Sequence, residues 1–539
     1  MNYETLQELY AHSIKTYAER PLFSMLERES LTYSEFDARV EQVRGLLLGA
    51  GLNGGDKVAI LSSNMPNWNV CYFAAVTSGM VAVPIMPDFS AEEIERLLAH
   101  SEARALMISD RQYSRVPKSV LEGMNIVIRT KNLSVLNRTV FETGTPSIPH
   151  PDDPAALIYT SGTTSSPKGV LLSHRNLTTQ TRMNYELFPV RAEDIFLSVL
   201  PLSHTYECSI GMLLPFMSGA SVVYADRMPT ASNLLPVLAQ IRPTIMLVVP
   251  LIIEKIYKNQ ILARFTASKF KNYFYSKPFF RKRIHRFAGR RLYKLFGGRL
   301  RFFGIGGTRL DSETERFLLE GKFPYAIGYG LTETAPLIAG AIPGKVRIGS
   351  TGVLLPGIEG RLENMNDAGE GELSVKSPCT MLGYYKNPEL TAAVITADGW
   401  FHTHDICRFD ADGYLYVKGR AGSMILGPNG ENIYPEDIES VINSHFLVTD
   451  SLVTEDSGKL IALVKFNRSE LEKRYHNLKD DLAATMETIK SDIIKYVNSK
   501  VNKFSRIAHI HEQHQDFEKT PSQKIKRHLY TNKNKPQNK

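Results

Sequence analysis

The sequence predicts an α/β protein. We expect a large amino-terminal domain of doubly wound mixed or parallel sheets with a small β-barrel, followed by a small α+β domain at the carboxyl end. Three observations lead to this class. A chain of 539 residues is too long for one hydrophobic core. Strand-like apolar runs alternate with helical patterns, and a glycine-rich stretch near residue 421 marks a boundary late in the chain.

The alternation is clearest early in the chain. Residues 57–61, 81–84 and 103–109 are short apolar runs typical of buried strands, and 68–78 and 90–100 between them have helical patterns. Parallel strands joined by crossover helices give this order. The same order returns later, with helices expected at 233–240 and 312–320 and strands at 244–250 and 300–304.

From about residue 352 the pattern changes to short alternating strands with glycine turns, as in 371–376 and 413–419, which suits an antiparallel sheet or a small barrel. We expect a first domain over 1–420 and a second over 421–539. The second should contain one long polar helix, 469–501, and the last ten residues, rich in Asn and Lys, should be disordered.

Composition describes an ordinary globular protein, with 43% hydrophobic and 22% charged residues. The four cysteines are far apart and have neither metal-ligand nor disulfide spacing. The amino terminus lacks the basic region followed by an apolar run that marks a secretory signal. We therefore expect a cytoplasmic protein.

The net charge of +8 is concentrated in one segment. Residues 255–301 contain fifteen Lys and Arg and no Asp or Glu, which leaves the rest of the chain at −7 (8 − 15). Many aromatic residues lie among these cations, a mixture that suits an anionic membrane surface. A nucleic-acid surface is the competing interpretation, but no nucleic-acid motif accompanies the segment, so we expect no nucleic-acid partner. The simplest alternative is a solvated helical insertion whose aromatic side chains pack inward.

A loop rich in small hydroxyl residues carries the strongest sign of function. Residues 159–170 read YTSGTTSSPKGV. Backbone N–H groups and hydroxyls in such a loop approach a polyphosphate closely, and Lys168 adds positive charge. The spacing of the usual nucleotide loop, G-x-x-x-x-G-K-[ST], is absent. Taken alone, the run is more often a surface turn.

Further segments follow the loop in order: LPLSHTYE at 200–207, GYGLTETA at 328–335, GWFHTHD at 399–405 with DADGYLYVKGR at 410–420, and GENIYPEDIE at 430–439 with TPSQK at 520–524. In this order they resemble the adenylate-forming superfamily of acyl-CoA synthetases, peptide-synthetase adenylation domains and firefly-type luciferases. The resemblance runs from about Thr5 to about Tyr530. The basic insertion and the ending TPSQKIKR are most similar to long-chain fatty acid–CoA ligases.

The resemblance implies ATP-dependent ligation of a fatty acid to CoA. The carboxylate attacks the α-phosphate of ATP to give an acyl-adenylate and pyrophosphate, and the CoA thiol then displaces AMP. ATP, Mg²⁺ and CoA are the implied cofactors and co-substrates. The carboxyl-terminal domain would act as a rotating lid that excludes water.

The family's site residues carry over onto matching positions. Phosphates would be held by the loop and its lysine, Mg²⁺ by one hydroxyl and one carboxylate, adenine and ribose by an aromatic, a carboxylate and an arginine, and the acyl-adenylate by glycines and a pocket wall. The nucleotide residues are Thr160, Ser161, Gly162, Thr163, Thr164, Lys168, Gly328, Tyr329, Thr332, Asp405 and Arg420. The metal ligands are Thr160 and Glu333, and the acyl and adenylate pocket has His204, Tyr206, Gly306 and Gly307. The CoA route has Gly430, Glu431 and Asn432.

Lys524 is the catalytic lysine that the resemblance implies, beside Glu333 and Lys168. It would bridge the carboxylate and the phosphate during adenylation and leave as the small domain rotates. Without the resemblance, Lys524 would be one more solvated cation in a basic tail. Ser423 stands where the hinge usually has Asp or Lys, so the hinge residue is left open.

Two alternatives remain, one an enzyme of the same fold and one from a different class of function. A protein of the same fold could load an acyl carrier protein or stop at the adenylate, and a catalytically silent relative could only bind lipid or nucleotide. The intact charged residues of the motifs argue against a silent relative. Acyl chain length, the choice between free CoA and carrier protein, and a homodimer are left open.

Overall fold

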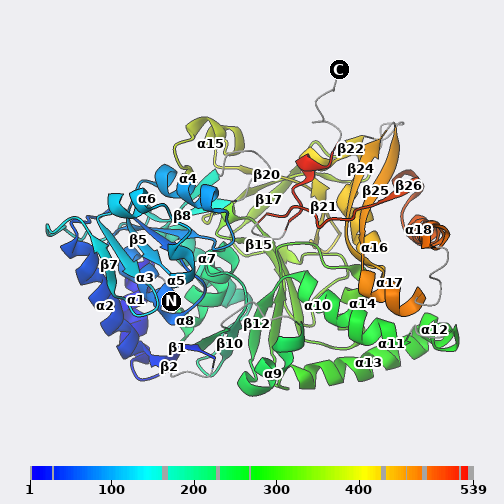
Figure 1. Ribbon diagram of the computed structural model, residues 1–539, viewed down its shortest axis with the longest axis horizontal. Coiled ribbons are helices and arrows are strands. Elements are labelled where there is room, and N and C mark those ends of the chain that lie inside the picture. Colours follow the sequence, from blue (N-terminus) through cyan, green and yellow to red (C-terminus); the bar gives the residue numbers. More distant parts are fainter. Residues whose placement is uncertain are drawn as a thin grey trace.

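The structure is a computed structural model that describes residues 3–26, 30–160, 168–225, 231–265, 269–426, 432–456, 458–475, 482–520 and 524–531 (Figure 1). Of the last ten residues, expected to be disordered, 532–539 lie outside this part. The chain forms two large sheets, a four-stranded sheet, a two-stranded sheet and a three-stranded sheet.

The first large sheet has eight strands and contains the early alternation. β3, β4 and β5 are parallel, and α3 (Pro66–Val76) and α4 (Ala91–Ser101) connect them, which confirms the expected order. Across the sheet the strands are β19 (Gly383–Tyr384), β9 (Lys168–Ser173), β8 (Pro154–Thr160), β4 (Val81–Ile85), β3 (Lys57–Leu61), β5 (Ala103–Ile108), β6 (Ile126–Arg129) and β7 (Val135–Arg138).

The second large sheet has nine strands. β10, β12, β13 and β14 run parallel, so their carboxyl ends meet at one edge of the sheet. Across the sheet the strands are β16 (Val353–Leu354), β15 (Leu337–Ala341), β14 (Tyr325–Gly330), β13 (Phe302–Ile305), β12 (Ile245–Val248), β10 (Ile195–Ser198), β11 (Ser221–Tyr224), β1 (Pro21–Met25) and β2 (Ser30–Thr32).

Helices of the large domain cover these sheets and pack between them (Figure 1). They are α1 (Leu6–Tyr17), α2 (Tyr33–Gly49), α5 (Asp110–Tyr113), α6 (Lys118–Gly123), α7 (His174–Leu187), α8 (Leu214–Ser218), α9 (Ala231–Ile241), α10 (Pro250–Ile256), α11 (Ala263–Phe265), α12 (Lys269–Ser276), α13 (Pro278–Leu295), α14 (Ser312–Glu320) and α15 (Pro388–Val394). π-helical turns cover Glu207–Leu213 and Tyr257–Leu262, and 3₁₀ turns cover Thr332–Thr334 and Ala421–Ser423.

The later segment with glycine turns forms an open antiparallel sheet. Its strands are β17 (Glu359–Glu363), β18 (Gly371–Lys376), β20 (Phe401–Phe409) and β21 (Leu415–Arg420), in that order. No pairing between described residues joins β17 to β21, so these strands form an open sheet. The antiparallel sheet is therefore the form present, and the expected small barrel is not. Instead, β21 contacts α16 (Pro435–Asn443) of the carboxyl-terminal region.

The carboxyl-terminal region has its own sheet, β24 (Val448–Asp456), β25 (Lys459–Phe466) and β26 (His509–Glu512), beside the short pair β22 (Ile425–Leu426) and β23 (Asn432–Ile433). In the interval expected to be one long helix, the structure describes two, α17 (Arg468–Tyr475) and α18 (Leu482–Asn498). Short 3₁₀ turns cover Lys503–Ser505 and Arg527–Leu529. The boundary at residue 420 stays a prediction.

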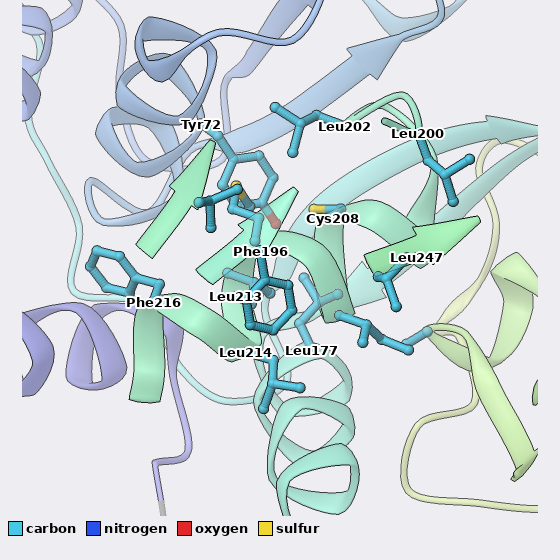
Figure 2. Close-up of a cluster of buried hydrophobic side chains, with 14 of the residues drawn as sticks. Tyr72, Leu177, Phe196, Leu200, Leu202, Cys208, Leu213, Leu214, Phe216 and Leu247 are labelled. Carbon is cyan, nitrogen blue, oxygen red and sulfur yellow. The ribbon is translucent and has the colours of Figure 1, made fainter. Parts of the chain in front are cut away.

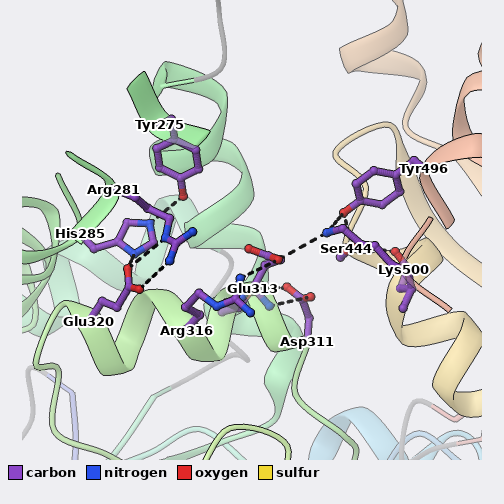
Figure 3. A network of polar contacts seen from close by, with 12 residues as sticks. Tyr275, Arg281, His285, Asp311, Glu313, Arg316, Glu320, Ser444, Tyr496 and Lys500 are labelled. Atoms are coloured by element: carbon purple, nitrogen blue, oxygen red, sulfur yellow. Dashed lines mark hydrogen bonds and ion pairs between the residues drawn. The ribbon is translucent and has the colours of Figure 1, made fainter. Parts of the chain in front are cut away.

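The basic segment forms α12 and α13, and its aromatic residues divide between two environments. Tyr275 is buried and donates or accepts a 2.8 Å hydrogen bond with Tyr257, while its hydroxyl lies 2.7 Å from Nε2 of His285. The other ring nitrogen of His285 lies 2.7 Å from Glu320 of α14 (Figure 3). The expected inward packing is therefore correct for this face of the helices.

The opposite face of α12 and α13 meets solvent. Tyr273, Phe279 and Phe287 are 60%, 61% and 69% exposed, respectively. Arg283 lies over the Phe279 ring, 4.5 Å from its centroid. Large apolar side chains exposed among cations form a mixed basic and aromatic surface. Among the described residues, none of the helices has the length and apolar character needed to cross a bilayer.

The main core contains a cluster of aromatic rings around Phe216 of α8, which has no exposed surface. Its ring centroid lies 4.5 Å from that of Phe73 on α3 and 5.8 Å from that of Tyr10 on α1. Figure 2 shows Phe216 with neighbouring core side chains, including Leu213 and Leu214. Such rings bury large apolar areas and add favourable edge and stacking contacts.

We predict that Phe216→Ala destabilises the large domain by about 3–5 kcal/mol, because the substitution loses apolar contacts and leaves a cavity. Thermal denaturation followed by circular dichroism measures the change. Phe141→Ala is the matched control, because Phe141 is 75% exposed and its loss should change stability by less than about 0.5 kcal/mol. Equal melting temperatures for the two variants would contradict the packing described.

Candidate functional site

Predicted site residues from three sheets meet at the junction between the large domain and the carboxyl-terminal region. Tyr329 is the second-last residue of β14, Thr160 ends β8, and Asp405 and Arg420 face each other on β20 and β21. Lys524 reaches the same junction from the carboxyl-terminal region. Residues separated by hundreds of positions in the chain are thus brought together by the sheet edges.

A buried carboxylate is the centre of this cluster. Asp405 is 4% exposed, and its Oδ1 lies 2.8 Å from Nε of Arg420, its cross-strand partner. The hydroxyl of Tyr329 donates a 2.6 Å hydrogen bond to Oδ2. Burial raises the pKa of Asp405, and the positive charge of Arg420 opposes this rise. The contact ties the nine-stranded sheet to the four-stranded sheet.

A second acidic group lies at the end of the β8–β9 hairpin. Glu333, in the turn after β14, accepts a 2.9 Å hydrogen bond from the hydroxyl of Tyr384. Nζ of Lys168 lies 5.4 Å from the centroid of the Tyr384 ring, and Lys168 pairs with Thr160 across the hairpin. Tyr384 therefore links the carboxylate of Glu333 to Lys168, and Lys168 is the strand partner of Thr160.

The segment 200–207 places three more side chains at the junction. Thr205 donates a 3.2 Å hydrogen bond to the hydroxyl of Thr332. Burial lowers the pKa of His204 to about 4, and the positive charge of Lys524 contributes to the shift. His204 is therefore uncharged at neutral pH. Tyr206 lies further in, against the glycines of β13.

Lys524 is held by two hydrogen bonds with Thr520. The backbone N–H of Thr520 donates a 2.7 Å bond to the carbonyl of Lys524, and the N–H of Lys524 donates to the hydroxyl of Thr520 at 3.2 Å. Although part of its side chain meets solvent, desolvation lowers the pKa of Lys524, and the charge of Arg420 adds to this. Asp405 and Glu333 act in the opposite direction, so the lysine lies within electrostatic range of both acids.

Described residues on either side of Lys524 form ion pairs with the rest of the carboxyl-terminal region. Nζ of Lys519 lies 2.9 Å from a carboxylate oxygen of Asp450, and Arg527 pairs with Glu439. The region also contacts the large domain directly. Lys500 lies 3.4 Å from Glu313 of α14 (Figure 3). Movement of this region would therefore carry Lys524 with it.

Several predicted residues lie outside the described part of the chain. These are Ser161, Gly162, Thr163 and Thr164 of the phosphate loop, and Gly430 and Glu431 of the CoA route. Asn432 begins β23. Between the described residues, no group of three or more His, Cys, Asp or Glu side chains could hold a metal ion. All four cysteines are buried and unpaired.

An apolar cavity extends into the large domain from Tyr206. Its volume is about 50 Å³, below the roughly 300–1,000 Å³ of small-molecule sites, so the apolar walls would have to move apart to admit a long chain. Its walls come from the nine-stranded sheet, α7 and the π-helical turn after Tyr206; Figure 2 shows Phe196, Leu214 and Leu247 among core side chains. The lining residues are Asn184, Leu187, Phe188, Val190, Phe196, Tyr206, Ile210, Leu214, Ile245, Leu247, Phe302, Gly304, Ala326, Ile327, Gly328, Leu337, Gly340 and Ala341.

Glycines keep the inner end of the cavity open. A Cβ atom on Gly304 would lie 3.0 Å from the hydroxyl of Tyr206, and one on Gly306 would lie 3.3 Å from its ring. Gly307 has a φ of +89°, which disfavours any other residue. Gly306 and Gly307 do not line the cavity; Gly304 and Gly328 do. The predicted glycines therefore lie beside the predicted pocket wall.

Sequence reasoning missed Tyr384, Thr205 and most of the cavity lining. Tyr384 lies on β19, which pairs with β9 although the two strands are far apart in sequence. No spacing in the chain indicated this pairing. Gly304 was within an expected strand, and its lack of a side chain was the one available signal.

Comparison with known proteins agrees with this arrangement. The family model for the AMP-binding enzyme matches residues 10–385, and the model for the AMP-binding enzyme C-terminal domain matches residues 423–536. The chain is 28% identical to the long-chain-fatty-acid–CoA ligase FadD15 of Mycobacterium tuberculosis, over 91% of this chain and 89% of the relative. It is 25% identical to fatty acyl-CoA synthetase A of Dictyostelium discoideum, over 92% of this chain and 83% of the relative.

Solved structures share the fold. An o-succinylbenzoate coenzyme A synthetase from Bacillus subtilis, in complex with AMP, aligns with a TM-score of 0.77, 22% identity and 97% coverage of both chains. The anthranilate CoA ligase AuaEII, in complex with anthranoyl-AMP, aligns with a TM-score of 0.79 and 20% identity, over 97% of this chain and 96% of that chain. Because the first family model spans well over half of its length, the chain belongs to the AMP-binding enzyme family.

Proposed function

We propose that the protein is an ATP-dependent ligase that joins a fatty acid to CoA through an acyl-adenylate and releases AMP and pyrophosphate. The observation that carries the proposal is the apolar cavity whose inner end, at Tyr206, Gly304 and Gly328, adjoins the charged cluster of Asp405 and Lys524. A substrate with an apolar tail and a carboxylate head fits this pairing of environments. Relatives named as long-chain ligases support the choice of a long chain.

In this proposal the charged cluster binds the nucleotide. Asp405, with Arg420, would accept hydrogen bonds from the ribose hydroxyls, and the Tyr329 ring would stack on adenine. Lys168 and the loop before it would hold the outer phosphates, with Thr332 at the α-phosphate. Phosphoryl chemistry needs positioning and charge neutralisation more than covalent help, and these residues supply both.

The donor set suits Mg²⁺. The ion prefers oxygen ligands and keeps several waters, so few protein ligands are needed. The Glu333 carboxylate and the Thr160 hydroxyl lie at the same end of the β8–β9 hairpin, and Tyr384 orients the carboxylate. When bound, Mg²⁺ would neutralise phosphate charge.

Lys524 would supply the charge that is needed only during adenylation, when negative charge builds between carboxylate and α-phosphate. His204 is uncharged and would act at the acyl-site mouth as a gate. Rotation of the carboxyl-terminal region would then remove Lys524 and bring Gly430, Glu431 and Asn432 to the pantetheine route. Loading of an acyl carrier protein, or arrest at the adenylate, is the alternative within the same fold.

The mixed surface of α12 and α13 supports a second proposal, peripheral contact with an anionic membrane. Its exposed rings suit the headgroup region, and each cation adds roughly 1 kcal/mol near anionic lipid. The His285–Glu320 contact fixes α13 to the large domain, which leaves the exposed face free to bind. A protein bound at the membrane surface would receive its fatty acid directly from the lipid phase.

We predict that AMP release with carboxylates of two to twenty carbons depends on CoA and peaks at twelve to eighteen carbons, because a longer chain buries more methylenes between the apolar walls. The assay is AMP formation with and without CoA. Pyrophosphate release that is indifferent to CoA would contradict the ligase and indicate an adenylate-only or carrier-loading enzyme.

We predict that Lys524→Ala lowers the adenylation rate by roughly 10²–10³-fold, because it removes a charge that stabilises the transition state. Thioester formation from a supplied acyl-adenylate should be spared. Single-turnover assays separate the two half-reactions. Lys526→Ala is the matched control, the same substitution two residues further along the chain. Equal loss of both half-reactions in Lys524→Ala would remove the proposed role.

We predict that binding to liposomes requires anionic lipid and weakens with salt, because exposed charges are screened within about 8 Å at physiological ionic strength. Arg286→Glu with Arg290→Glu on the exposed face of α13 should weaken binding by roughly tenfold or more. Lys118→Glu with Lys131→Glu is the control, two exposed lysines outside the segment. Co-sedimentation measures binding, and indifference to lipid charge and to salt would contradict the electrostatic surface.

A further inference from the structure

The apolar cavity runs along the parallel strands of the nine-stranded sheet. Phe302 at the start of β13 and Gly304 two residues later both line it, and Ile245 and Leu247 do the same on β12. The carboxyl ends of these strands face the charged cluster. Residues at the strand starts therefore lie at the outer end of the cavity, away from the reacting carboxylate.

Two rings close this outer end. Phe188 follows α7 and Phe302 begins β13, and their ring centroids are 4.6 Å apart with an interplanar angle of 42°. Both residues line the cavity, yet both are only half-buried. The pair therefore separates the apolar interior from the surface of the molecule.

An ion pair holds the first ring in place. The guanidinium of Arg301 lies over the Phe188 ring, with its carbon 5.0 Å from the centroid. The same group lies 2.9 Å from Oδ2 of Asp194, which is 3% exposed, and donates a 3.2 Å hydrogen bond to the carbonyl of Pro189. An arginine fixed by a buried carboxylate is a rigid support, since its own movement would break several contacts.

We propose that Phe188 and Phe302 form the end wall that sets the longest acyl chain accepted, and that Arg301 and Asp194 position Phe188. This inference rests on the proposed fatty acid ligase. Each methylene moved from water into an apolar site changes binding by roughly fourfold, so a wall that admits or excludes two carbons changes selectivity strongly. Because both rings are partly exposed, removal of one opens a path to the surface and adds length to the cavity.

The test is the chain-length profile of Phe188→Ala, measured as kcat/KM with saturated fatty acids of eight to twenty carbons in the complete reaction with ATP and CoA. The kcat/KM for the acid two carbons longer than the wild-type optimum is divided by the kcat/KM for the optimum itself. This ratio should be roughly tenfold or more higher in Phe188→Ala than in the wild-type protein. The KM for ATP should not change, because the wall lies far from the nucleotide residues. Phe188→Leu should shift the profile in the same direction by less.

Phe141→Ala is the matched control, a loss of the same ring at a 75% exposed position, and it should leave the profile unchanged. If Phe188→Ala does not fold, Phe188→Leu decides the question. In folded variants, an unshifted profile, or an equal loss of kcat/KM at all chain lengths, would contradict the role of Phe188 as an end wall. Either result would not contradict the proposed ligase activity. Failure of the wild-type protein to activate any fatty acid would instead overturn the proposed function and this inference with it.

Discussion

The buried ion pair of Asp405 and Arg420 is the contact on which the arrangement of the site depends. It joins two strands of the four-stranded sheet, and the hydroxyl of Tyr329 ties it to the nine-stranded sheet. An isolated buried carboxylate is costly, so the pair and the hydrogen bond together keep it in place. Because Asp405 is also in electrostatic range of Lys524, the position of the carboxyl-terminal region is coupled to the same group.

Two environments of opposite character meet at this point. The cluster on one side holds acids, an arginine and two lysines, and the cavity on the other side has almost wholly apolar walls. Tyr206 and the glycines of β13 and β14 separate them, since larger residues there would close the passage. A molecule with a charged head and an apolar tail is the chemical class that both environments can satisfy at once.

Much of this could be predicted from the sequence. Helix and strand periodicity gave the alternation in both large sheets, because buried parallel strands are nearly continuous apolar runs. The sequence motifs alone identify five residues of the charged cluster: Asp405, Arg420, Tyr329, Glu333 and Lys524. The place of Tyr384 in the site could not be predicted from the sequence, because it depends on the pairing of β19 with β9. The division of aromatic residues in α12 and α13 likewise depends on Glu320 of another helix.

A crystal structure with a non-hydrolysable fatty acyl-adenylate analogue tests the central claim most directly, because it locates the head and the tail of the intermediate together. The account predicts the ribose against Asp405, the linkage near Lys524, and the acyl chain in the cavity between Tyr206 and Phe302. An analogue bound with its chain outside this cavity, or with its nucleotide away from Asp405, would contradict the account.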